Sequence, residues 1–203
     1  MMMARLGVAM GRYEAALAEF PVPTKMATGG VLWGAGDLVA QSGTPRRADE
    51  AAGLDAERLG RAVVFGTLVH APIAHVHYEF LEAFVRRFRI TGNRAALTKL
   101  VMEQFVYWGY FSNALYHFSM AKMEGRTLEE SAQRVRERLW PTMKAQWAFW
   151  CPVQLLNFKF VPVRHQLNVV LVTSVVWTGF LSFAFSPSST PSKSSDADAA
   201  PAS

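Results

Sequence analysis

Long apolar runs alternate with short polar stretches along this chain. The last run is the clearest, because no Asp, Glu, Lys or Arg occurs between His165 and Ser192. Within it, LNVVLVTSVVWTGFLSFAF supplies about 19 residues, enough for a helix to cross a hydrocarbon core of roughly 30 Å. The pattern predicts a transmembrane helix over residues 166–185.

Three earlier runs are similar in length but contain a few polar groups each. Together with a last block that contains the clear run, they predict an all-α membrane bundle of four transmembrane helices, at about 24–41, 59–85, 97–120 and 147–185. The polar stretch MEGRTLEESAQRVRERL predicts an amphipathic helix before the last span. Four spans would place both termini on one side of the membrane, together with the basic loop RRFRITGNR.

The two ends of the chain lie outside this predicted domain, 24–185. Residues 1–23 contain no acid before Glu14, which fits a mitochondrial presequence or a simple N-terminal helix. Residues 186–203 are rich in Ser, Pro and Ala, and this composition predicts a disordered tail.

The composition favours a membrane protein. Hydrophobic residues make up 51% and charged residues 18% of the chain, against about 25% charged residues in a typical soluble domain. The net charge of +5 suits either nucleic acid or an anionic membrane surface. The basic residues stand mainly in short loops, without a patch of interleaved exposed aromatics, so we expect no nucleic-acid binding. The expected partner is the lipid bilayer.

A narrow polar stripe marks the first span. At 100° per residue, Gly30, Gly34, Asp37 and Gln41 lie within about 60° of one another. Gly30 and Gly34 form a G-x-x-x-G pair that allows close helix packing, and Asp37 would be expensive in contact with lipid. We therefore predict that this face points into the bundle. The alternative is that Asp37 caps a short soluble helix.

A second polar stripe runs along the third span. Its members fall within about 80° of one another and are Lys99, Glu103, Tyr110, Asn113 and His117. Lys99 and Glu103 stand one turn apart. This spacing predicts either a structural ion pair or part of the lining of a hydrated path.

The second span contains three histidines. Gly66, His70 and His77 share one side, although Pro72 is expected to kink the helix. His75 points elsewhere and no second cluster of ligands occurs, so we expect no metal and no cofactor.

The segment WCPVQLLNFKFVP combines an apolar run with two amides and two prolines. On a helix, Trp147, Trp150, Gln154 and Asn157 share one face. The amides can therefore bond to a neighbouring helix or to water in a cavity. Proline frees a backbone carbonyl and bends the chain, which is tolerated at membrane depth where protein or water satisfies that carbonyl.

Four stretches of the chain together resemble a known family. They are FPVPTKMATGGVLWGAGDLVAQ, RAVVFGTLVHAPIAHVHYEFLE, KLVMEQ and WAFWCPVQLLNFKFVPVR with the later Trp177, Leu181 and Ser182. They resemble the successive signatures of the Mpv-seventeen and 22-kDa peroxisomal membrane protein family. The chain departs from the family pattern at several positions, among them His77, where a tryptophan is usual, and Glu103, where an aspartate is usual.

The resemblance implies a four-span, all-helical protein of the mitochondrial inner membrane or the peroxisomal membrane. It also implies no known catalytic chemistry and a proposed channel-like role in moving small molecules. Between the two membranes, we favour the mitochondrial inner membrane.

Two classes of function follow. The first class is a channel or facilitator for small solutes. Ionisable groups inside a membrane usually indicate such a path, which would here be lined by Asp37, Gln41, Lys99, Glu103, Gln154 and Asn157. In a structural or assembly protein, the same groups only hold helices together, with Gly30 and Gly34 setting the close packing. No catalytic motif occurs at a usable spacing, so we expect no enzyme. The identity of the solute and the formation of a homo-oligomer stay open.

Overall fold

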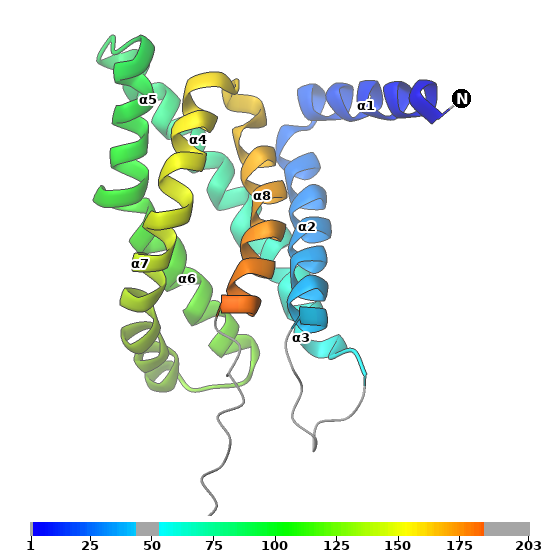
Figure 1. The fold of residues 1–203 in the computed structure, drawn as a ribbon, viewed down its shortest axis with the longest axis vertical. Helices are drawn as coiled ribbons and strands as arrows, with labels where there is room; N and C mark the ends of the chain where they lie inside the picture. Colours follow the sequence, from blue (N-terminus) through cyan, green and yellow to red (C-terminus); the bar gives the residue numbers. More distant parts are fainter. Residues whose placement is uncertain (1, 44–52, 185–203) are drawn as a thin grey trace, which may run out of the picture.

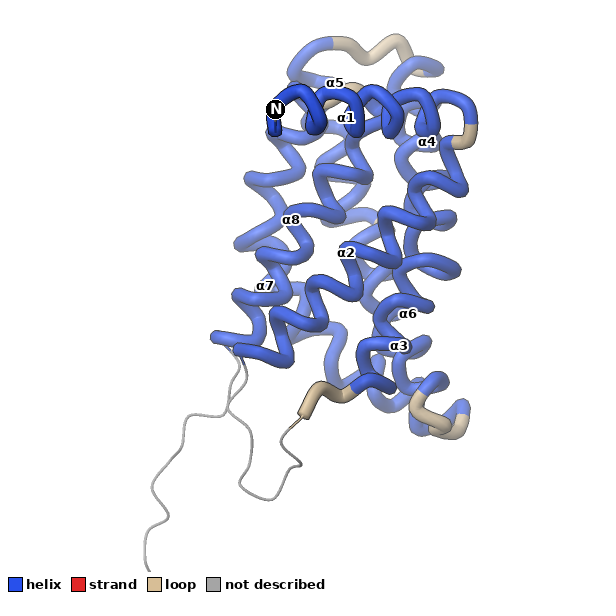
Figure 2. The backbone as a smooth tube through the Cα atoms, turned by 90° about the vertical axis from the view of Figure 1, so that its right-hand side faces the viewer, coloured by secondary structure: helices blue, strands red, loops and turns tan. Residues whose placement is uncertain are grey.

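Every regular element that the structure describes is a helix, which confirms the predicted all-α class (Figure 2). The structure is a computed structural model. It describes residues 2–43 and 53–184, with side chains for 8–42 and 53–177. The predicted disordered tail, 186–203, lies outside the described residues.

The N-terminal segment forms helix α1, Met2–Glu19, which projects sideways from the bundle at the start of α2 (Figure 1). Leu17 on its inner face is buried, and Tyr13 Oη lies 3.3 Å from Thr28 Oγ1. Helix α2, Pro21–Gly43, begins with a proline, which suits a first helical position because the missing N–H has no helical partner there. α2 then runs along the bundle against the last helix, α8, Val163–Ala184.

The second pass is one continuous helix in three parts: α3, Ala56–Val64, the π-helical turn η1, Phe65–His70, and α4, Ala71–Arg87. η1 ends two residues before Pro72. The proline has no N–H to donate and its ring crowds the preceding turn of helix, and the wider π-helical turn reduces this steric clash. Within residues 2–43 and 53–184, only the helix Ala56–Arg87 is long and apolar enough to cross a membrane by length and composition, with a mean hydropathy of 1.3 over its best 18 residues.

The third pass is interrupted. It consists of α5, Gly92–Val101, the π-helical turn η2, Met102–Val106, and α6, Trp108–Met123. Tyr107 between η2 and α6 has φ −146° and ψ −44°, outside the helical region. The interruption changes which side chains face inward on either side of it, so a stripe drawn on one regular helix holds only within each part.

Helix α7, Leu128–Phe160, joins two segments that the sequence analysis separated. Its first part is the predicted amphipathic helix, and its last part is the beginning of the predicted fourth span. α7 ends at Phe160, and the next residue, Val161, has an extended backbone. This conformation is expected for a residue that precedes a proline, here Pro162. α8 then runs back alongside α7 (Figure 1). The block 147–185 is therefore two antiparallel helices and not one span.

This division changes the topology. In the described part of the chain, helices traverse the bundle five times: α2, α3 to α4, α5 to α6, α7 and α8 (Figure 1). α1 lies at the end that carries the turn between α4 and α5, whereas α8 ends at the opposite end. Four passes would have brought α1 and the end of α8 to the same end of the bundle, and the fifth pass arises because the chain reverses at Pro162.

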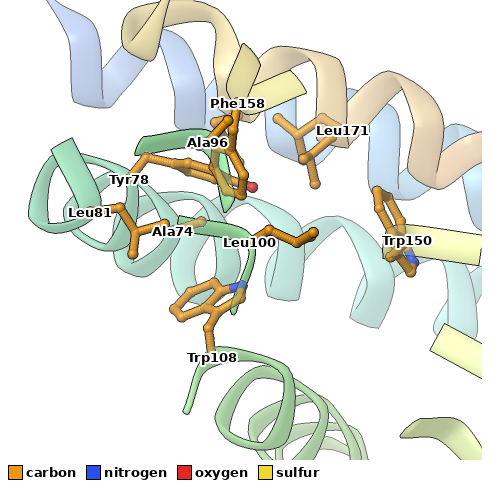
Figure 3. Packing of buried hydrophobic residues seen from close by; sticks show 11 residues of the cluster. Ala74, Tyr78, Leu81, Ala96, Leu100, Trp108, Trp150, Phe158 and Leu171 are labelled. Carbon is orange, nitrogen blue, oxygen red and sulfur yellow. The ribbon is translucent and has the colours of Figure 1, made fainter. Parts of the chain in front are cut away.

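A buried apolar cluster holds these passes together. Its members come from α4 to α8 and include Ala74, Tyr78, Leu81, Ala96, Leu100, Trp108, Trp150, Phe158 and Leu171 (Figure 3). Large apolar side chains also cover the outside of the bundle: Val31, Val76 and Val176 are 71%, 66% and 64% exposed. Exposed apolar surface of this extent is typical of a protein that contacts a membrane or a partner.

Candidate functional site

The polar stripe of the first span lies against α3. Gly30 and Gly34 are both buried. A Cβ added to Gly34 would lie 2.9 Å from Val63 Cγ2, and one added to the neighbouring Gly29 would lie 2.7 Å from the carbonyl oxygen of Gly66. Both distances are too short for a real Cβ, so the helices approach this closely because the residues are glycines.

Asp37 and Gln41 form a clasp between α2 and the start of α3. Arg58 Nε donates to Asp37 Oδ1 at 2.7 Å, and Gln41 Nε2 donates to Asp37 Oδ2 at 2.7 Å. The Gln41 amide also bonds the backbone of Asp55 in both directions, at 3.0 and 2.8 Å. Asp37 is thus buried within α2 and is not a helix cap. The bond from Arg58 to Asp37 and the two bonds between Gln41 and Asp55 hold α2 to the following segment.

A cavity of about 220 Å³ lies inside the bundle. Aromatic rings of Trp33, Phe65, Trp108, Tyr116, Trp150 and Trp177 form part of its wall. Its polar wall includes Glu103, Gln104, Ser112, Asn113, Gln146 and Gln154. A space of this size with several polar partners is large enough to hold water.

Amides from α6 and α7 form one side of the cavity. Asn113 donates to the Gln146 side-chain carbonyl, and Gln146 Nε2 donates to Gln104 Oε1 at 3.1 Å. Trp147 Nε1 donates to the backbone carbonyl of Gln104 at 3.0 Å. Because Gln104 lies in η2, just before the helix break, its carbonyl is available to a neighbouring helix.

The end of the cavity near α4 and α5 is closed by a polar group around Glu103, which is 1% exposed. Tyr78 Oη donates to Glu103 Oε1 at 3.1 Å, and the Gln154 amide donates to both Glu103 and Tyr78 Oη. His77 stacks on Trp108 with ring centroids 3.8 Å apart, and its Nε2 lies 3.7 Å from Glu103 Oε1. The carboxylate is buried here because donors surround it.

Lys99 does not pair with Glu103. Its Nζ donates to Glu82 Oε2 at 2.5 Å, on the side of α5 that faces α4. The π-helical turn that contains Glu103 changes the angular spacing between the two residues, and Tyr78 and Gln154 already satisfy the carboxylate.

The amides of the WCPVQLLNFKFVP segment connect α7 to α8. Asn157 Nδ2 donates to Gln154 Oε1 at 2.8 Å and to the carbonyl of Gln166 at 3.2 Å, and Gln166 Nε2 donates to the Val161 carbonyl at 2.9 Å. The carbonyl of Val161 comes just before the proline that ends α7. These amides therefore stabilise the reversal of the chain.

A second, charged cavity of about 370 Å³ opens at the other end of the bundle. We call it the vestibule, and its charged side chains are Asp37, Arg58, Arg61, Glu124 and Arg134. Burial raises the pKa of Glu124, but hydrogen bonds and charge from Arg134 and Arg126 outweigh that effect and hold this pKa below its ordinary value. The vestibule and the inner cavity share three wall residues, Trp33, Tyr116 and His117, which we call the neck.

The predicted path residues thus fall into two groups. Asp37 lines the vestibule, and Glu103 and Gln154 line the inner cavity. Gln41, Lys99 and Asn157 line neither of them and make contacts between helices or between turns. Of the third-span stripe, Asn113 and His117 line the inner cavity and Tyr110 does not.

Sequence reasoning missed other wall residues. Gln146 stands one turn before Trp150 and continues the face that carries Gln154, so the spacing could have indicated it. Trp33 and Tyr116 were not found, because an aromatic side chain in an apolar span carries no signal that separates a cavity wall from a lipid contact.

The histidines of the second span lie in different surroundings. His70 lines the cavity, whereas His75 Nδ1 lies 2.9 Å from Lys25 Nζ.

Comparison with known proteins identifies the family. The sequence pattern of the Mpv17 / PMP22 family matches residues 121–182. Protein SYM1 of Eremothecium gossypii is 35% identical to this chain, over 87% of the chain and 96% of the relative. The chain belongs to the Mpv17 / PMP22 family. The family resemblance drawn from the sequence is thereby confirmed.

Other members of the Mpv17 / PMP22 family indicate where the protein resides. Protein SYM1 of Saccharomyces cerevisiae is 30% identical over 84% of this chain and 87% of the relative. A relative from Danio rerio, named mitochondrial inner membrane protein Mpv17, is 30% identical over 84% of this chain and 93% of its own length. The chain is a protein of the mitochondrial inner membrane, as the sequence analysis favoured. No solved structure matches it.

Proposed function

We propose that this chain is a channel or facilitator through which small solutes cross the mitochondrial inner membrane. The observation that carries the proposal is a cavity with polar side chains in its wall, inside a bundle with an apolar exterior, next to a charged vestibule that shares the neck residues with it. Burying a polar side chain in a membrane costs free energy, so such side chains usually bond to a neighbouring helix or line a route for solutes. Several polar side chains of this bundle line the inner cavity.

In the proposed path, a solute enters at the vestibule and passes the neck into the inner cavity. The group around Glu103, Tyr78 and Gln154 then closes the way toward the opposite end. In this proposal, the hydrogen-bonded group is the barrier of a closed state. Opening requires Gln154 and Tyr78 to separate from the Glu103 carboxylate. Solvent or solute must then donate hydrogen bonds to this carboxylate in their place.

In this proposal, each of the five passes crosses the bilayer. Trp140, 53% exposed on α7, marks the headgroup level at the vestibule end, because tryptophan prefers membrane interfaces. From Trp140 to Phe160, α7 spans about 30 Å, which matches the hydrocarbon core.

The test is flux of small solutes through the purified protein in liposomes, with a variant that fills the cavity. Ser112→Trp places a large ring in the inner cavity, and we expect it to abolish flux while the protein still unfolds cooperatively. Phe111→Trp is the matched control, since Phe111 is 47% exposed and does not line the cavity. Flux that is equal in both variants would contradict the path.

The alternative function is a structural or assembly protein. It is favoured by one observation: Gln41, Lys99 and Asn157 are used in contacts between helices or turns. Such a protein shows no flux in liposomes, and Ser112→Trp then affects stability alone.

A further inference from the structure

The charges of the vestibule are unevenly compensated. It is lined by three arginines and two carboxylates, one positive charge in excess. Arg58 is paired with Asp37 at 2.7 Å and Arg134 with Glu124 at 2.5 Å.

Arg61 is held differently from these two arginines. Its ion pair, at 3.4 Å, is with Glu57, whose side chain is 89% exposed, while its own is only 23% exposed. A pair with a fully solvated partner contributes little. The guanidinium of Arg61 therefore keeps donors available toward the vestibule.

The neck adds a second group of a particular chemistry. Trp33 Nε1 is buried and has no hydrogen-bond partner among the described residues. Because an indole N–H can only donate, a buried one calls for an acceptor. Beside it, the Trp33 and Tyr116 rings pack against each other with their centroids 5.5 Å apart and form an apolar part of the wall.

We infer that the vestibule and neck form a binding site for small organic anions such as short-chain carboxylates. Arg61 holds the anionic group, since a guanidinium matches a carboxylate in a bidentate manner. Trp33 donates its N–H to an oxygen of the ligand, and the carbon skeleton lies against the Trp33 and Tyr116 rings. The assignment rests on the proposed function for the role of the site as an entrance.

The ligand is a free solute and not a lipid headgroup. The vestibule wall is built from α2, α3, α6 and α7, with side chains that converge between these helices. Its volume of about 370 Å³ lies at the low end of small-molecule pockets, which are roughly 300–1,000 Å³. A short carboxylate fits such a site better than a phospholipid does.

Binding is tested with the purified full-length chain in an uncharged detergent, with succinate as the probe and its neutral diamide as the comparison. Succinate should raise the Tm in a concentration-dependent way, and the diamide should not. Arg61→Gln should weaken succinate binding by about tenfold or more, because it removes a charge-assisted hydrogen bond. Trp33→Phe keeps a ring but removes the N–H, and should also weaken binding.

Arg136→Gln is the matched control, because Arg136 is exposed on α7 and does not line the vestibule. It should bind succinate like the unaltered chain. Equal effects of succinate and its diamide, or unaltered binding in Arg61→Gln, would overturn the site. Stabilisation by an anionic phospholipid but not by succinate would reassign it to a headgroup and overturn the proposal as well.

Flux measurements separate this inference from the proposed function. Succinate binding without any flux in liposomes would contradict the channel and leave the anion site supported. Flux of small solutes without succinate binding would support the channel and overturn the anion site.

Discussion

At the scale of the residue, small side chains decide how closely the helices approach. Gly34 leaves room for Val63, and Gly66 leaves room for the Trp33 side chain, whose Cβ would lie 2.6 Å from an added Cβ. The position of Trp33, and with it the neck, depends on this glycine. Packing and the candidate path therefore share residues.

We expect Gly34→Leu to destabilise the protein by roughly 1–3 kcal/mol, because the new side chain would overlap α3. The measurement is the Tm of the purified protein and the amount of folded protein in the membrane. Gly60→Leu is the control, since a Cβ at Gly60 meets nothing within 4 Å. If both variants behave alike, the close packing of α2 and α3 contributes nothing measurable.

At the scale of the element, α7 has the best-defined start. Thr127 and Glu130 form a capping box: Thr127 Oγ1 accepts from the Glu130 N–H at 3.2 Å, and Glu130 Oε2 accepts from the Thr127 N–H at 2.8 Å. The bonds from the Thr127 backbone and side chain lower the pKa of Glu130 below its ordinary value. The charged form of Glu130 is thus favoured in the folded state.

We expect Thr127→Ala to lower the free energy of unfolding by about 1 kcal/mol, the usual effect of a lost N-cap. Chemical denaturation of the two proteins measures this difference.

The pH dependence of the free energy of unfolding follows from the lowered pKa of Glu130. Its contribution is complete above the ordinary pKa of a glutamate and is lost as the pH falls through the lower, folded-state pKa. Denaturation of the unaltered chain and of Glu130→Gln should therefore converge at acid pH, and a constant difference between them would contradict the capping role.

At the scale of the whole molecule, the sequence could predict the helical class, the family and most inward faces, because apolar periodicity and glycine spacing are local. It could not predict the reversal after α7. Pro162 stands there between Lys159 and Arg164, but a proline predicts only a local bend, and the apolar residues on both sides led hydropathy to join two antiparallel helices into one block. The sequence also could not predict the hydrogen-bond partners of Glu103. They depend on the π-helical turn η2 and on side chains from α4 and α7.

Five passes predict that tags on the two termini lie on opposite sides of the inner membrane. The turn between α4 and α5 lies at the end occupied by α1. This turn and the adjoining ends of the two helices carry Arg86, Arg87, Arg89 and Arg94. If basic loops remain on the matrix side, the N-terminal tag is protected from protease in mitoplasts and the C-terminal tag is cleaved. Protection of both tags, or cleavage of both, would show an even number of crossings.

In the proposed orientation, with Trp140 at the headgroup level, the length of α7 places the Arg134 side of the vestibule outside the hydrocarbon core. Its 33 residues span about 50 Å, some 20 Å more than the hydrocarbon core. Arg134 stands six residues before Trp140, about 9 Å beyond the headgroup level along the helix. This distance is close to the Debye length at physiological ionic strength, roughly 8 Å. The negative surface potential of anionic lipids has therefore decayed to about a third at Arg134, and an anion can approach the arginines without strong repulsion from the membrane.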